Sequence, residues 1–153
     1  MYDYLKNRSV LYVEDEKDVL NNISKLLTKF FDNFYTALDG ITALDIFYEK
    51  DIDIMLVDIE LPKMSGIELI REVRKTNKDV KIIIISAYTK TDYLLESVEL
   101  GLSKYVVKPL TSKKIRTILE TIDNYYKDLD KTTSLCGATI DRKNFILKQY
   151  WRS

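Results

Sequence analysis

The chain has 153 residues, and its 24 lysines and arginines are balanced by 24 aspartates and glutamates, so its formal net charge is zero. A neutral chain has no overall field that would attract it to nucleic acid or to a membrane surface. The sequence contains no histidine, which excludes histidine general bases, Ser-His and Cys-His nucleophile pairs and histidine metal ligands. Any chemistry therefore depends on carboxylates, lysines, hydroxyls or a metal ion that they bind.

Cysteine content and the N-terminus indicate the compartment. Cys136 is the only cysteine, so it cannot form a disulfide within the chain, and a thiolate zinc site needs several sulfurs. Residues 1–6 lack the apolar core of a signal peptide, and no apolar run approaches the ~20 residues of a transmembrane helix. We expect a cytoplasmic protein with no membrane partner.

Five short apolar runs alternate with five stretches of helical apolar spacing. The runs predict strands at 10–13, 34–38, 53–58, 82–85 and 105–107, and the helical spacing predicts helices at 19–30, 41–48, 67–73, 94–98 and 115–126. Ser65 and Glu68 form a capping box before the third helix, and Gly101 suits the end of the fourth. This alternation predicts an α/β fold with a doubly wound, five-stranded parallel sheet covered by helices on both faces. We expect the flavodoxin-like strand order 2-1-3-4-5.

The last part of the chain has a different pattern. Residues 131–134 are typical of a linker, and two β-prone runs, 138–140 and 145–147, flank a turn-like segment. We therefore expect one domain over residues 1–127, followed over residues 128–153 by a linker and a short β-hairpin-like tail.

Asp58 directly follows the four apolar residues 54–57. A run that is apolar at every position fits a strand buried on both faces. Ligand sites lie outside the carboxyl ends of the strands in open α/β sheets, so Asp58 is a site candidate. An aspartate here is also common as a turn former or as a helix N-cap.

The same edge of the sheet collects Glu14 and Asp15 after the first strand, Ser86 after the fourth and Lys108 after the fifth. Crowded carboxylates repel one another unless a cation lies among them, and hard carboxylate oxygens beside a phosphate favour Mg²⁺. A lysine and a hydroxyl supply the remaining contacts that a phosphoryl group needs. The pattern indicates phosphoryl transfer onto an aspartate.

Five motifs agree with this interpretation, in order and at a common spacing: LYVEDE at 11–16, LVD at 56–58, LPKMSG at 61–66, ISA at 85–87 and YVVKP at 105–109. Together they resemble the receiver domain of two-component response regulators, over about residues 8–127. The resemblance implies a signalling domain and not an enzyme. It implies that the domain accepts a phosphoryl group from a sensor histidine kinase in a Mg²⁺-dependent reaction.

The resemblance also implies where the metal ion binds. Asp58 is the implied phosphoacceptor and a metal ligand. Asp15 is implied to bind Mg²⁺ directly, Glu14 to bind it directly or through water, and Glu60 to offer its backbone carbonyl.

Further residues match the motifs of the family. The resemblance assigns Ser86 and Lys108 to phosphoryl oxygens, implies a cis peptide bond before Pro109 and gives Gly66 a structural role. Tyr105 matches an aromatic switch that is expected to turn inward on phosphorylation. That motion would change the surface of the fourth helix, fifth strand and fifth helix, which is also the expected site of homodimerisation. A core position at the start of a strand is the alternative for Tyr105.

Two other classes of function remain open on the sequence. One is a receiver-like docking module that is not phosphorylated. The other is an aspartate-based phosphatase, but such enzymes need a second aspartate two residues after the nucleophile, and Glu60 occupies that position without the accompanying Gly-Thr pair. Flavin binding is disfavoured because no Ser/Thr/Gly-rich phosphate loop follows the first strand.

The tail resembles the opening strands of the winged-helix DNA-binding domains that commonly follow receivers, which implies transcription regulation as the output. Such a domain needs about 100 residues, and only about 26 follow Lys127. We expect DNA binding only through an output domain absent from this chain. A truncated transcription factor and a stand-alone receiver with an extension are both consistent with this length.

Overall fold

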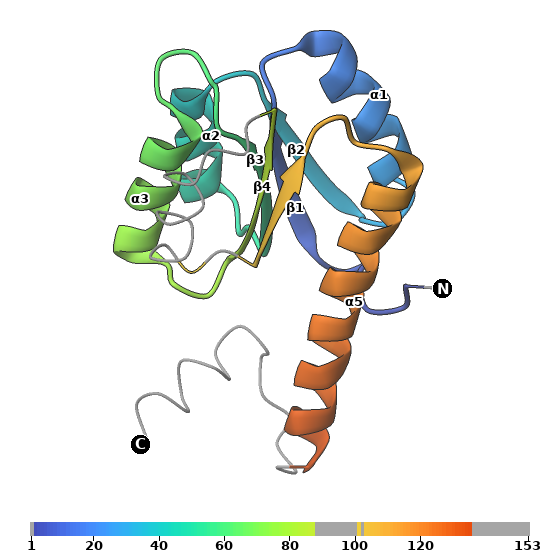
Figure 1. Cartoon of the computed structure of the whole chain (residues 1–153). Helices are drawn as coiled ribbons and strands as arrows, with labels where there is room; N and C mark the ends of the chain where they lie inside the picture. The colour runs from blue at the N-terminus through green and yellow to red at the C-terminus, as the bar shows by residue number, and fades with distance from the viewer. Residues whose placement is uncertain (1, 88–100, 102, 136–153) are drawn as a thin grey trace.

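A five-stranded parallel sheet forms the centre of the computed structural model, which describes residues 2–87, 101 and 103–135 (Figure 1). The strands are β1 (Ser9–Val13), β2 (Asn33–Ala37), β3 (Ile54–Asp58), β4 (Lys81–Ser86) and β5 (Lys104–Val107). Their order is β2-β1-β3-β4-β5, and every pair is parallel. The predicted flavodoxin-like order is therefore confirmed.

Helices cover both faces of this sheet. They are α1 (Lys17–Leu27), α2 (Gly40–Glu49), α3 (Gly66–Thr76) and α5 (Ser112–Leu135). Figure 1 shows α2 and α3 on one face and α1 and α5 on the other. The fourth helix, expected around 94–98, lies outside the described residues.

The core consists of two apolar clusters, one on each face of the sheet. Side chains alternate along a strand, so Val10 and Tyr12 of β1 join the α1 and α5 side, and Leu11 and Val13 join the α2 and α3 side. Every residue of β1 and β3 is buried, as the continuous apolar runs predicted. The carboxyl ends of β1 and β3 therefore emerge directly from the apolar core.

The loops that follow β2 and β3 each end at a capped helix N-terminus. The Thr42 N–H donates to Asp39 Oδ1 at 2.8 Å and begins α2. The predicted capping box is confirmed, because the Glu68 N–H donates to Ser65 Oγ at 3.2 Å and the Ser65 N–H donates to Glu68 Oε2 at 3.4 Å. These caps satisfy N–H groups that a helix start leaves unpaired and hold the loop after Asp58 in place.

The fifth helix is longer than the sequence indicated. It runs through Lys127 to Leu135, so residues 131–134, where a linker is expected, are helical, and the expected boundary at 127 falls inside a helix. Threonine hydroxyls bond to carbonyls one turn earlier, as in the 3.0 Å bond from Thr132 Oγ1 to Asp128 O, and so fit within the helix. The β-prone runs 138–140 and 145–147 lie outside the described residues.

A short N-terminal segment packs against α5, although its sequence predicted no element. Leu5 is fully buried in the α1 and α5 cluster. The Tyr4 N–H donates to Asp123 Oδ1 at 3.0 Å, and the Arg8 guanidinium lies 3.9 Å from the centre of the Tyr126 ring. The segment thus covers apolar surface near the start of β1. Among the residues that the structure describes, no helix is both long and apolar enough to cross a membrane.

Gly66 allows α3 to begin directly against the end of β3. Its N–H donates to Ile59 O at 2.8 Å, and a Cβ at this position would lie 2.2 Å from Asp58 O. We predict that Gly66→Ala lowers the free energy of unfolding by about 2–3 kcal/mol, because the backbone of the loop must move to accept the methyl group. Urea unfolding measures this change.

Gly101 offers the matched control. Its φ is 66°, but among the described residues no other part of the chain lies within 4 Å of a Cβ built there. Asparagine adopts this conformation readily, so Gly101→Asn should change the unfolding free energy by less than about 1 kcal/mol. Equal stability of Gly66→Ala and the unmodified chain would contradict the close approach.

Candidate functional site

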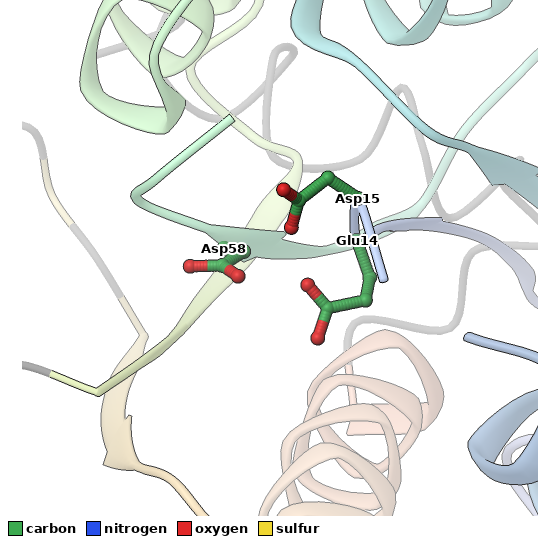
Figure 2. Close-up of side chains that lie close together, drawn as sticks. All are labelled: Glu14, Asp15 and Asp58. Atoms are coloured by element: carbon green, nitrogen blue, oxygen red, sulfur yellow. The ribbon is translucent and has the colours of Figure 1, made fainter. Parts of the chain in front are cut away.

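Three carboxylates meet at the carboxyl edge of the sheet. Glu14 and Asp15 follow β1, and Asp58 is the last residue of the adjacent strand β3. One oxygen from each of these three residues lies within 4.8 Å of the other two. Figure 2 shows the three side chains gathered around a common space. The parallel register brings them together because it aligns the ends of β1 and β3, with Val13 beside Val57.

Lys108, one residue after β5, forms ion pairs with two of these acids. Its Nζ donates to Glu14 Oε1 at 2.6 Å and to Asp58 Oδ2 at 2.8 Å. Both carboxylates are buried, so the pair is screened little by water. The Lys108 N–H also donates to Ser86 O at 2.7 Å, and the peptide bond between Lys108 and Pro109 is cis. Lys108 is therefore tied to the sheet edge through its backbone and its side chain.

The acids and the lysine change one another's pKa values. Burial, with the neighbouring Asp58, raises the pKa of Glu14 to about 7, and the bond with Lys108 opposes this rise. Burial lowers the pKa of Lys108, but its bonds with Asp58 and Glu14 outweigh that effect and raise the pKa to about 12. Lys108 thus remains a cation near neutral pH, and the site as a whole is short of positive charge.

The Asp58 carboxylate is held in one orientation by both of its oxygens. Oδ2 accepts from Lys108, and Oδ1 accepts from the Glu60 N–H at 3.1 Å. The Glu60 side chain is exposed, so this residue contributes to the site through its backbone. A buried aspartate fixed in this way presents its carboxylate toward the space that it shares with Asp15.

Ser86 and Tyr105 lie on the two neighbouring strands. The β3–β4 register pairs Asp58 with Ile85, so Ser86 lies one residue beyond Asp58 at the same edge, fully buried. Tyr105 is half-buried and packs against the cluster on the α2 and α3 side. The structure thus brings Ser86 next to the acids and keeps Tyr105 outside their cluster.

A cavity of about 570 Å³ adjoins Asp15 and Glu60. Its wall includes Ser65, the N-cap of α3, and Glu68 and Arg71 of that helix. The sequence interpretation assigned Ser65 and Glu68 to helix capping alone and did not include Arg71. Their spacing of three residues places them on one side of a helix, and this was the available signal that they line a common surface.

The donor set fits a hard divalent cation. Three carboxylates supply oxygen ligands that lie close together. Magnesium prefers such oxygens and keeps several waters, for which the adjoining cavity has room. The residues at this edge therefore offer the kind of oxygen ligands that Mg²⁺ prefers.

Comparison with known proteins shows which family the chain belongs to. Residues 10–120 match the response regulator receiver domain, and the chain belongs to this family of two-component signalling domains. TrrA, a response regulator protein of Thermotoga maritima solved in complex with Mg²⁺-BeF, is 30% identical with a TM-score of 0.65, over 74% of this chain and 97% of that chain.

Two further structures are similar. A response regulator receiver domain protein from Clostridium thermocellum is 28% identical with a TM-score of 0.71, over 80% of this chain and 99% of that chain. The Vibrio cholerae chemotaxis protein CheY4 is 25% identical with a TM-score of 0.68, over 74% of this chain and 96% of that chain. The similarity therefore covers nearly the full length of each of these structures.

The raised pKa of Glu14 predicts how stability depends on pH. The pKa is about 7 in the fold against an ordinary value of 4.5, so between these values the folded state binds more protons than the unfolded state. The free energy of unfolding therefore falls as pH rises through this range. Without metal at about pH 8, we predict that Glu14→Gln is more stable than the unmodified chain by roughly 1–3 kcal/mol, with little difference at about pH 5.

Urea unfolding in buffer with EDTA at several pH values measures this difference. Glu16→Gln is the control, because Glu16 is exposed, and its stability should follow that of the unmodified chain. A Glu14→Gln profile parallel to that of the unmodified chain would show that Glu14 does not titrate in this range.

Proposed function

We propose that this chain is a phosphoacceptor domain in which Asp58 takes a phosphoryl group from the phosphohistidine of a sensor kinase, in a Mg²⁺-dependent reaction. The observation that carries the proposal is the ion-paired group at the sheet edge. Lys108 joins Asp58 and Glu14, and Asp15 lies within reach of both acids. Membership of the receiver family and the Mg²⁺-BeF complex of TrrA support it.

In the proposed step, a carboxylate oxygen of Asp58 attacks the phosphorus atom. A P–O bond to Asp58 forms, the P–N bond to the kinase histidine breaks, and the imidazole nitrogen keeps the electron pair of that bond. Lys108 stabilises negative charge on the phosphoryl oxygens, since its ammonium already lies 2.8 Å from Asp58 Oδ2. The Glu60 N–H keeps the attacking carboxylate oriented. The Ser86 hydroxyl would contact another phosphoryl oxygen.

Asp15, Asp58 and Glu14 would hold the metal ion, together with the backbone carbonyl of Glu60. Bound there, Mg²⁺ neutralises the acids and stabilises charge on the phosphoryl oxygens. Asp15 is exposed at the cavity, whereas Glu14 is buried behind it. Asp15 is therefore the acid with direct access to hydrated metal from solvent.

The proposed readout passes from Ser86 to Tyr105. The β4–β5 register pairs Ile84 with Tyr105 and Ser86 with Val107, so the two residues lie two positions apart along adjacent strands. Attraction of the Ser86 hydroxyl to a phosphoryl group on Asp58 would let the half-buried Tyr105 ring turn inward. The surface of the fourth helix, β5 and α5 would then change and control homodimerisation or an output domain.

We further propose a cytoplasmic location and a kinase partner. Transcription regulation through DNA would require an output domain beyond this receiver. The helix that continues to Leu135 moves the proposed end of the receiver past residue 127. An unphosphorylated docking module and a phosphatase remain as the alternatives that the first experiment below distinguishes.

Asp58→Asn tests the acceptor. Incubation with acetyl phosphate and Mg²⁺ should add one phosphoryl group to the unmodified chain, read as intact mass, and none to the variant, because an amide oxygen is a poor nucleophile. Asp45→Asn, an exposed aspartate of α2, should be phosphorylated like the unmodified chain. Absence of any adduct on the unmodified chain would favour the docking module, and steady release of phosphate from small esters would favour the phosphatase.

Asp15→Asn tests the metal site. Mg²⁺ that binds only the folded chain stabilises it by about 2.7 kcal/mol at 100 times the dissociation constant. We predict that most of this gain is lost in Asp15→Asn, as measured by urea unfolding with Mg²⁺ or EDTA. Asp18→Asn, an exposed acid in the first turn of α1, should keep the gain. An equal Mg²⁺ effect in the two variants would place the metal elsewhere.

A further inference from the structure

Two buried polar atoms near the end of β1 lack hydrogen-bond partners within the described residues. They are the hydroxyl of Tyr12 and Oε2 of Glu14. Tyr12 is 1% exposed and Glu14 is fully buried. A buried hydroxyl or carboxylate oxygen without a partner is unfavourable, and more so when it is charged. One of these atoms is a donor and the other an acceptor.

The two side chains point to the same side of the sheet. The pairing of β1 with β2 continues past Val13, because the Glu14 N–H donates to Ala37 O at 3.1 Å. Residues two apart on an extended strand share a face, and Tyr12 belongs to the cluster on the α1 and α5 side. In Figure 2 the Glu14 side chain extends toward the orange-tinted helix, and its carboxylate faces the space that it shares with Asp15 and Asp58.

The other two unpartnered buried atoms do not compete for this role. Arg8 Nε belongs to a residue that precedes the opposite end of β1, where its guanidinium lies over Tyr126. Ser24 Oγ is on α1, where a serine hydroxyl can turn to a carbonyl one turn earlier in its own helix. Tyr12 and Glu14 lie instead near the carboxyl end of β1, at the acids of the site.

We propose that the Tyr12 hydroxyl donates to Glu14 Oε2 through one buried water, and that Tyr12 is the positioning residue of this carboxylate. Glu14 is then held at both oxygens, Oε1 by Lys108 and Oε2 by Tyr12. This inference rests on the proposed function, since it concerns an acid of the proposed metal site. It adds a tyrosine that the site residues inferred from the sequence do not include.

The electrostatic environment keeps Tyr12 a donor. Burial raises the pKa of the Tyr12 hydroxyl, and the negative charges of Glu14, Asp58 and Glu16 raise it further. The phenol is therefore protonated at neutral pH, with its proton available to a carboxylate. A group that orients a metal-binding side chain typically changes metal affinity by 10–100-fold when it is removed.

Tyr12→Phe removes the hydroxyl and keeps the ring. We expect the dissociation constant for Mg²⁺, measured by isothermal titration calorimetry on the whole chain, to rise about tenfold. The matched control is Tyr126→Phe, which removes a hydroxyl from the same apolar cluster beneath Arg8. Its Mg²⁺ affinity should equal that of the unmodified chain, which separates positioning of Glu14 from general loosening of the core.

A double-mutant cycle with Glu14→Gln locates the effect. If Tyr12 acts through Glu14, adding Tyr12→Phe to Glu14→Gln should change Mg²⁺ affinity much less than it changes the affinity of the unmodified chain. NMR of the unmodified chain needs no stable variant. We expect the Tyr12 hydroxyl proton to exchange slowly with solvent. We also expect it to show cross-relaxation to the Glu14 side chain or to a bound water.

Equal Mg²⁺ affinity of Tyr12→Phe and Tyr126→Phe would overturn the inference, as would an undiminished Tyr12 effect in the Glu14→Gln background or a Tyr12 hydroxyl in rapid exchange. These results would leave the proposed function intact if the unmodified chain binds Mg²⁺ and accepts a phosphoryl group on Asp58. Failure of the unmodified chain to bind Mg²⁺ would overturn both.

Discussion

The shared ion pair of Lys108 with Glu14 and Asp58 is the interaction on which the site depends. Two buried carboxylates at adjacent strand ends repel each other, and the ammonium 2.6 and 2.8 Å from them supplies the compensating charge. Burial and the neighbouring Asp58 keep the pKa of Glu14 raised, because one cation does not balance the acids at this edge. The folded site is thus stable enough to persist and still attracts further positive charge.

The register of the sheet brings residues that are far apart in the chain into this arrangement. Glu14 and Lys108 are 94 positions apart in the chain, yet parallel pairing of β1, β3, β4 and β5 aligns their carboxyl ends. Burial of β1 and β3 on both faces holds that register, since a shift by one residue would expose the apolar side chains or bury polar ones. The order of the strands and the chemistry at their edge therefore have one physical origin.

The two ends of the described chain depend on packing that local pattern does not reveal. Residues 131–134 have linker-like composition, but they continue a helix that the preceding turns, anchored by Tyr126 and Leu129 on the core, have already started. Segment 2–8 has no periodicity, and it is ordered by Leu5 in the core and Arg8 over Tyr126. Tertiary contacts thus order segment 2–8, whereas residues 131–134 extend a helix that the turns before them have nucleated.

The sequence by itself determined the alternation of strands and helices, the strand order and the residues that gather at one edge, because hydrophobic periodicity and motif spacing are properties of the chain alone. Only the tertiary structure decided that Lys108 bridges two acids, that Glu14 is buried with one oxygen unpartnered, and that the Tyr12 hydroxyl is buried on the same side. Those properties follow from distance and desolvation, which arise when separate strands pack together and water is excluded between them.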